Sequence, residues 1–170
     1  MISEAQEKYL LKIPEDALAE IKPWDPAADE FAKRLLKQMH SANPELEILW
    51  SGSLALGISG QNDVDLTMFA EPEEFEKNLL GLISVLGEPQ IKTPDKILWR
   101  IRKDGYKVDA YLGSKNSEEI KFQIQFFQSL KSDPKLVREY EQLKEGVVGL
   151  SAREYQRRKC EFYNKVLGLA

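Results

Sequence analysis

Cysteine and histidine are nearly absent from this chain of 170 residues, which contains one of each. Cys160 has no second cysteine with which to form an intramolecular disulfide, and this composition fits a reducing compartment. We expect Cys160 to serve packing in a C-terminal helix. His40 gives no support to a Ser-His-Asp mechanism, and we expect it to interact with carbonyl groups at a helix end.

Long apolar runs are missing too. No stretch approaches the roughly 20 apolar residues of a membrane-spanning helix, and residues 1–7 lack the basic start and apolar stretch of a signal peptide. Basic residues are not in excess, since 24 Lys and Arg stand against 28 Asp and Glu, for a net charge of -4. This balance argues against extended DNA binding but leaves a local basic face open. We therefore expect a cytoplasmic protein with no membrane partner.

Hydrophobic periodicity divides the chain into helices and strands. The patterns predict helices over 3–11, 27–41, 72–86, 118–131, 134–145 and 151–167, a short helix over 53–58, and strands over 46–50, 64–69, 97–102 and 106–112. Asp104-Gly105 between the last two strands is a strong hairpin signal. Asp25 followed by Pro26 predicts a helix start, and Ser151 with Glu154 predicts a capping box.

The order of these elements predicts an α+β protein, in which helices flank a mixed β-sheet. A hydrophobic fraction of 42% and a length of 170 residues suffice for one domain, or for one core with a helical appendage. We expect the α/β core, with its N-terminal helices, to span 1–116. The C-terminal helical region should span 117–170 and pack on that core.

The residues that carry chemistry begin at Gly52-Ser53, and Asp63-Val64-Asp65 follows after nine intervening residues. If the acids lie on a strand, alternation sends Asp63 and Asp65 to one face and Val64 to the other. Two anions on one face repel each other, which costs stability unless a cation lies between them. The spacing therefore favours a divalent metal ion, of the kind that phosphoryl transfer requires.

A third acid and a glycine turn complete this pattern. Asp109 lies inside the second strand of the hairpin, where a carboxylate beside Asp63 and Asp65 would complete a three-acid cluster and help to activate an acceptor hydroxyl. Gly52 lacks a side chain, so a phosphate could approach its backbone. A helix beginning near Ser53 would direct free N–H groups at that anion, and the Ser53 hydroxyl would donate a further hydrogen bond.

These residues resemble the DNA polymerase β-like nucleotidyltransferase superfamily. From about Leu46 onward the chain resembles its GrpB-like (UPF0157-type) group, through the glycine-containing segment after Gly52-Ser53 and through the C-terminal pattern. That pattern consists of Phe126-Phe127-Gln128-Ser129-Leu130-Lys131-Ser132-Asp133-Pro134, then Tyr140, Leu143-Lys144, Tyr155, Lys159 and Phe162.

The resemblance implies a minimal nucleotidyltransferase sheet that binds Mg2+ or Mn2+ and an NTP. The implied metal ligands and catalytic acids are Asp63, Asp65 and Asp109, and the implied nucleotide-binding residues are Gly52, Ser53, Lys144 and Lys159. The enzyme would transfer a nucleoside monophosphate to an acceptor hydroxyl on a small molecule or an RNA end. The GrpB-like pattern usually has a Lys-Pro pair before its strand acid, whereas Gln61-Asn62 precedes the acids here. Because both spaced acids are present, the sequence favours retained catalysis.

Simpler interpretations stay open for each residue type. The acids could form the solvated edge of a strand, Ser53 could cap a helix, and Tyr140 and Tyr155 are better explained by packing between helices. Arg100 and Arg102 share one strand face, where they could pair with acids or contact phosphate. A non-catalytic nucleotide-binding module and a protein-interaction domain are the alternative functions.

Overall fold

The computed structural model describes residues 2–169, which form two compact units. The sheet unit comprises Trp24–Gly57 and Asn62–Lys121. The helical unit comprises 2–23, Ile58–Gln61 and 122–169, so each unit is assembled from segments that are separated in the sequence. The α+β fold class with a mixed sheet and flanking helices is confirmed.

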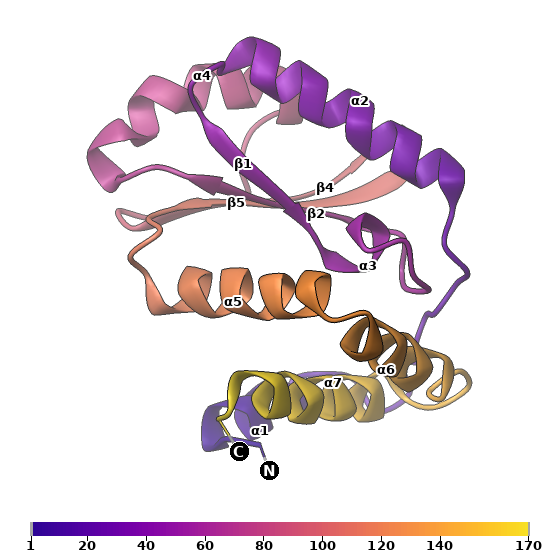
Figure 1. Cartoon of the computed structure of the whole chain (residues 1–170). Helices are drawn as coiled ribbons and strands as arrows, with labels where there is room; N and C mark the ends of the chain where they lie inside the picture. The colour runs from indigo at the N-terminus through magenta and orange to yellow at the C-terminus, as the bar shows by residue number, and fades with distance from the viewer. Residues whose placement is uncertain (1, 170) are drawn as a thin grey trace. The chain divides into compact units, whose positions relative to one another are not determined.

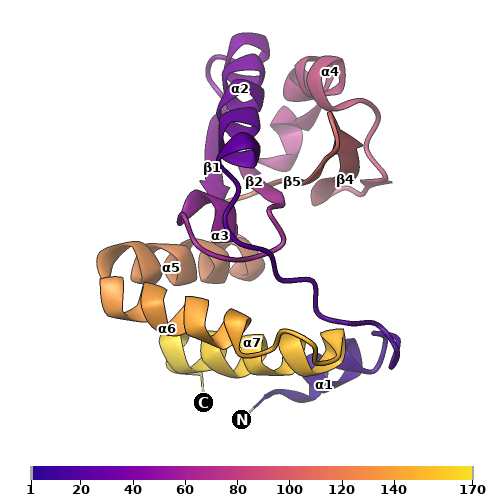
Figure 2. The same cartoon turned by 90° about the vertical axis from the view of Figure 1, so that its right-hand side faces the viewer.

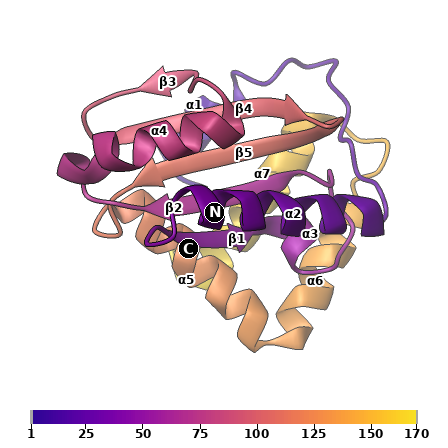
Figure 3. The same ribbon diagram turned by 90° about the horizontal axis from the view of Figure 1, so that it is seen from above.

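A five-stranded sheet in the order β1-β2-β5-β4-β3 organises the sheet unit (Figure 3). Its strands are β1 (Glu47–Ser51), β2 (Val64–Phe69), β3 (Ile91–Lys92), β4 (Lys96–Lys103) and β5 (Tyr106–Gly113). Only the β2–β5 pair is parallel, and the other neighbours are antiparallel. The predicted hairpin is confirmed, since β4 and β5 are joined at Asp104-Gly105, where both residues have positive φ.

Two amphipathic helices, α2 (Pro26–Ala42) and α4 (Phe75–Leu86), cover one face of this sheet (Figure 1). Their apolar positions recur at helical spacing, which places Phe31, Leu35 and Leu82 in the core with Trp99 of β4. Asp25 caps α2 and Pro26 occupies the first turn, as predicted. Nδ1 of His40 donates a hydrogen bond to the carbonyl of Leu36, 2.9 Å away, near the end of α2.

Some predicted boundaries were wrong. The helix predicted over 53–58 is α3 (Gly52–Ala55), and a 3-10 turn, η1 (Pro72–Glu74), precedes α4. Strand β3 was not predicted, because its two exposed residues pair with β4 and carry no alternating pattern. Because such a short edge strand exists through pairing with its neighbour, its own sequence contains little signal.

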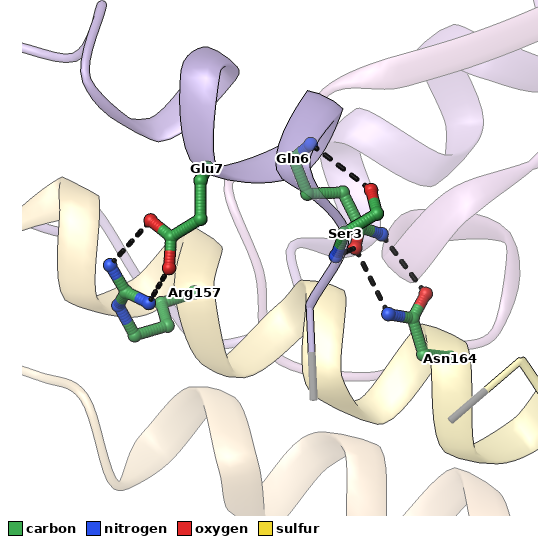
Figure 4. Close-up of polar contacts among 5 residues, drawn as sticks. All are labelled: Ser3, Gln6, Glu7, Arg157 and Asn164. Carbon is green, nitrogen blue, oxygen red and sulfur yellow. Dashed lines mark hydrogen bonds and ion pairs between the residues drawn. The ribbon is translucent and has the colours of Figure 1, made fainter.

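The helical unit contains α1 (Glu4–Leu10), α6 (Pro134–Glu145), α7 (Ala152–Leu167) and most of α5 (Glu118–Ser132). Helices α1 and α7 lie side by side (Figure 2). Two polar pairs join them: Glu7 accepts two hydrogen bonds from Arg157 at 2.7 and 3.0 Å, and Gln6 exchanges two amide hydrogen bonds with Asn164 (Figure 4). Residues 2–23 therefore belong to the helical unit, although they precede the sheet in sequence.

Aromatic side chains fill the centre of the helical unit. The rings of Tyr140 and Phe162 stack at 5.1 Å between centroids, and Phe126 meets both edge-on. Tyr140 and Tyr155 are buried, which confirms their packing role. Ser151 caps α7 by accepting from the N–H of Glu154, while the Glu154 carboxylate pairs with Arg158. None of the helices within residues 2–169 combines the length and apolarity needed to cross a bilayer.

Candidate active site

Asp65 and Asp109 are directly paired on the two parallel strands at the middle of the sheet. Their neighbours Leu66 and Ala110 are also paired, and these are buried under α2 and α4. Because side chains alternate along a strand, both aspartates project from the opposite face. Each is half-buried. Asp63 lies just before β2, outside the strand, so its position beside β5 is given by its bond to Lys107 and not by strand alternation.

Gly52 brings the chain against one of these aspartates. The last residue of β1, Ser51, pairs with Asp65, and Gly52 then turns the chain with a φ of +81°. A Cβ atom at Gly52 would lie 2.0 Å from Oδ2 of Asp65. Both the backbone conformation and the available space therefore require glycine here. The Gly52 turn and the Asp65 carboxylate therefore lie against each other.

Ser53 lies in the first turn of α3, and Ser51 is the N-cap residue. The alternative role of Ser53 as the helix cap is thus wrong. The first N–H groups of a helix have no partner inside it, so the turn 51–53 presents donors next to the Asp65 strand. Since α3 has four residues, its dipole is small.

Asp63 has a basic partner, Lys107, that was not among the predicted site residues. Nζ of Lys107 lies 3.3 Å from Oδ2 of Asp63, and the carboxylate is mostly buried. Burial raises the pKa of Asp63 above its ordinary value; Lys107 opposes the rise, and the nearby Asp109 charge adds to it. Lys107 could have been found from the sequence, because it lies two residues before Asp109 on the same strand face.

The donor chemistry of this site suits a hard divalent cation. All three candidate ligands are carboxylates, and Asp63 and Asp109 lie close enough to repel each other. As the side chains stand, however, no group of three or more acids, histidines or cysteines within residues 2–169 is arranged around one metal position. The Asp63 carboxylate is instead directed at Lys107. A cation would offset the repulsion between Asp63 and Asp109, so the chemistry of these carboxylates suits the ion, although they are not gathered around one position.

The two predicted lysines belong to the helical unit. Lys144 of α6 is fully buried, with Nζ 4.1 Å from the centroid of the Tyr140 ring. Lys159 of α7 is partly buried. Their contact with nucleotide phosphates stays a prediction.

Comparison with known proteins gives one curated relative and a set of solved structures. The chain is 30% identical over 129 residues to a UPF0157 protein of Vibrio cholerae serotype O1, which covers 74% of this chain and 66% of the relative. The chain thus spans just under two thirds of that protein's length. No family model matches the chain.

The similar solved structures include several of Cid1. One, described as providing a basis for the RNA terminal uridylyl transferase activity of Cid1, aligns with a TM-score of 0.52 at 17% identity, over 82% of this chain and 43% of Cid1. Another, of the Cid1 poly(U) polymerase with MgGTP bound, aligns with a TM-score of 0.49 at 14% identity, over 83% and 46%. The chain spans less than half of Cid1, and the first likeness shows a shared fold.

Proposed function

We propose that this chain is a GrpB-like nucleotidyltransferase, which uses Mg2+ or Mn2+ to transfer a nucleoside monophosphate from an NTP to an acceptor hydroxyl. Similarity to the UPF0157 protein supports the group, and the fold shared with Cid1 supports the superfamily. The observation that carries the proposal is the direct pairing of Asp65 with Asp109, beside a turn that only Gly52 can make.

In the proposed reaction, the acceptor oxygen forms a bond to the α-phosphorus of the NTP, and the bond to the β-phosphate oxygen breaks to release pyrophosphate. Asp63, Asp65 and Asp109 would hold the divalent ion, which supplies charge neutralisation at the triphosphate and acidifies the acceptor hydroxyl. Asp109 would take the proton of that hydroxyl. The N–H groups of the Gly52 turn and the Ser53 hydroxyl would donate hydrogen bonds to the triphosphate and hold it in line.

Replacing Asp65 tests this proposal. The native chain, Asp65→Asn and a control, Asp104→Asn, would be incubated with labelled NTPs, Mg2+ and pools of RNA oligonucleotides and small alcohols. Asp104 is an aspartate at the hairpin turn, where asparagine is equally suited to the positive φ. We expect the transfer rate of Asp65→Asn to fall at least about 10²-fold. The Asp104→Asn control should keep the native transfer rate. Full transferase activity in Asp65→Asn would refute the assignment.

A non-catalytic nucleotide-binding module is the second candidate. The ion pair between Asp63 and Lys107 favours this candidate, because it engages a carboxylate that the transferase would need for binding the metal ion. This candidate predicts saturable binding of Mg-ATP, measured by calorimetry, with no pyrophosphate released for any acceptor in the pools. Release of pyrophosphate that depends on acceptor and on Asp65 would exclude it.

A further inference from the structure

Three cations lie on the β4–β5 hairpin, on the same face of the sheet as the paired aspartates. Arg100 of β4 is directly opposite Asp109, and Arg102 is directly opposite Lys107. In an antiparallel pair, opposite residues project to the same side, with Cβ atoms about 4.5–5.5 Å apart. Arg100, Arg102 and Lys107 therefore form one basic patch, called here the hairpin patch, which borders Asp109.

The hairpin patch is exposed and only partly neutralised. Arg100, Arg102 and Lys107 are all exposed in the sheet unit. Lys107 pairs with Asp63, and Arg102 donates to the carbonyl of Gly105 at 3.4 Å. The guanidinium group of Arg100 makes no hydrogen bond or ion pair with any of the residues 2–169, although its backbone N–H donates to Gln90. An exposed guanidinium of this kind is ready to bind an anion.

The hairpin patch also places two like charges directly opposite each other. Arg102 and Lys107 face each other across the hairpin, and like charges in directly opposite positions destabilise a sheet. Asp63 relieves part of this repulsion, because it pairs with Lys107 and attracts Arg102, and Asp109 lies opposite Arg100. A bound anion would offset the remaining cost, since guanidinium groups bind phosphate oxygens in a bidentate way.

The order of the strands separates this patch from the proposed triphosphate position. Across the sheet, β1 leads into the Gly52 turn, β2 carries Asp65, β5 carries Asp109, and β4 carries the two arginines (Figure 3). The aspartates thus lie between the Gly52 turn on one side and the hairpin patch on the other. If the triphosphate binds at the turn, the hairpin patch lies on the side of Asp109 that is left for the acceptor.

We infer that the hairpin patch binds a phosphate group of the acceptor, so that the substrate is a phosphate-bearing alcohol of the nucleotide type. This inference rests on the proposed function for the role of the bound molecule. Arg100 and Arg102 are positioning residues in this scheme, because they hold the phosphate of the acceptor while its hydroxyl lies at Asp109. A neutral or cationic alcohol would gain nothing from the three positive charges.

The test measures binding separately from transfer. Fluorescently labelled hexauridylate, AMP and adenosine would be titrated into the full-length protein with Mg2+, and Mg-ATP binding would be measured independently. The variants are Arg100→Ala and Arg102→Ala. The control is Lys103→Ala, which removes one positive charge from the same strand but from the opposite face.

We expect hexauridylate or AMP to bind, and adenosine to bind at least about tenfold more weakly. Each arginine variant should lose about tenfold in affinity for the phosphate-bearing probe, and the slope of log affinity against log salt for hexauridylate should fall by about 0.7 per lost contact. Tighter binding of hexauridylate than AMP would identify an oligonucleotide as the source of the phosphate. Equal binding would identify a mononucleotide.

Two results would overturn the inference. One is equal binding of adenosine and AMP, and the other is an equal loss of affinity in Lys103→Ala, which would indicate unspecific attraction. Failure of the proposed function can be distinguished from these results. Absence of Mg-ATP binding, combined with probe binding that depends on Arg100 and Arg102, would reject the transferase assignment and leave the phosphate site in place.

Discussion

At Gly52 the backbone has a φ of +81°, and the position of a Cβ atom lies 2.0 Å from an oxygen of Asp65. Gly57 offers a close comparison, since its φ is +71° but nothing lies within 4 Å of its Cβ position. Both glycines have a positive φ, but only a side chain at Gly52 would collide with the Asp65 carboxylate. Alanine substitutions at both positions can therefore separate backbone strain from displacement of Asp65.

We predict that Gly52→Ala and Gly57→Ala each lower the free energy of unfolding by about 1–3 kcal/mol through backbone strain. Gly52→Ala should in addition force the Asp65 carboxylate away and lose the thermal stabilisation given by Mg-ATP. Gly57→Ala should keep that stabilisation. Thermal unfolding with and without Mg-ATP measures both effects, and an unchanged response in Gly52→Ala would contradict the proposed ligand role of Asp65.

A second prediction concerns the charge of Asp63 in the metal-free protein. Burial raises its folded-state pKa above the ordinary value of 3.8, although Lys107 opposes the rise. Ionised Asp63 is therefore less favourable in the folded than in the unfolded protein. This cost is absent below pH 3.8 and becomes complete once the pH has risen through the folded-state pKa.

Asp63→Asn should thus be more stable than the native chain at pH 7 in the presence of a chelator, and the difference should shrink as the pH falls toward 4. The lost ion pair with Lys107 counts little, because the lysine is 46% exposed. Urea unfolding between pH 4.5 and 8 measures the difference. A native chain that is more stable than Asp63→Asn at pH 7 would show that Lys107 outweighs burial.

At the level of whole elements, helices α2 and α4 approach each other closely at Asn43 and Gly81. Asn43 is buried at the end of α2, and the amide orientation that satisfies both of its atoms donates to the carbonyl of Asn78 and accepts from the N–H of Leu82. A Cβ atom at Gly81 would lie 2.6 Å from both the nitrogen and the oxygen of that amide. This glycine lets α4 pack against the amide that ends α2.

Gly81→Ala should lower the free energy of unfolding by about 1–3 kcal/mol through overpacking, despite the better helix propensity of alanine. In an Asn43→Ala background the clash is gone, so the same substitution should stabilise the protein by about 0.5–1 kcal/mol. Urea unfolding of the four variants in this cycle measures the reversal of sign. Destabilisation by Gly81→Ala in both backgrounds would contradict the contact.

At the level of the whole molecule, the chain passes between the two units after residues 23, 57, 61 and 121. The segment Ile58–Gln61 illustrates the consequence. It lies between the Gly52 turn and Asp63 in sequence, yet it is bonded to the helical unit, through Ser59 to Glu141 and Glu145 and through Gly60 to Lys22. Unfolding of the helical unit would release this segment and both of its connections to the candidate site.

We therefore predict that the two units unfold in a single transition. The three tryptophans, Trp24, Trp50 and Trp99, all belong to the sheet unit, and Cys160 belongs to the helical unit. Tryptophan fluorescence and the reactivity of Cys160 should show the same midpoint in urea. Burial raises the pKa of the Cys160 thiol, so its reaction with a disulfide reagent is slow in the folded protein. A lower midpoint for Cys160 would refute the single transition.

Local patterns anticipated most of the secondary structure. Asp25-Pro26 and Asp104-Gly105 fix backbone geometry through short-range sterics and hydrogen bonds, so the start of α2 and the β4–β5 turn could be predicted from a few residues. Strand β3 and the length of α3 depend on neighbours that are distant in the sequence, and these predictions failed. Lys107 lies between these two cases. Strand alternation predicts that its side chain shares a face with Asp109, but it does not predict the ion pair with Asp63.

For the candidate site, the spacing of Gly52-Ser53, Asp63 and Asp65 was sufficient to predict a turn followed by acids on one face, because alternation and glycine's conformational freedom are local properties. The register between β2 and β5 is a long-range property, and it sets Asp65 directly beside Asp109. The same holds for the closeness of Gly52 to Asp65 and for the register that sets Arg100 opposite Asp109. These contacts arise when the buried faces of separate strands align under α2 and α4, which no single segment of the sequence encodes.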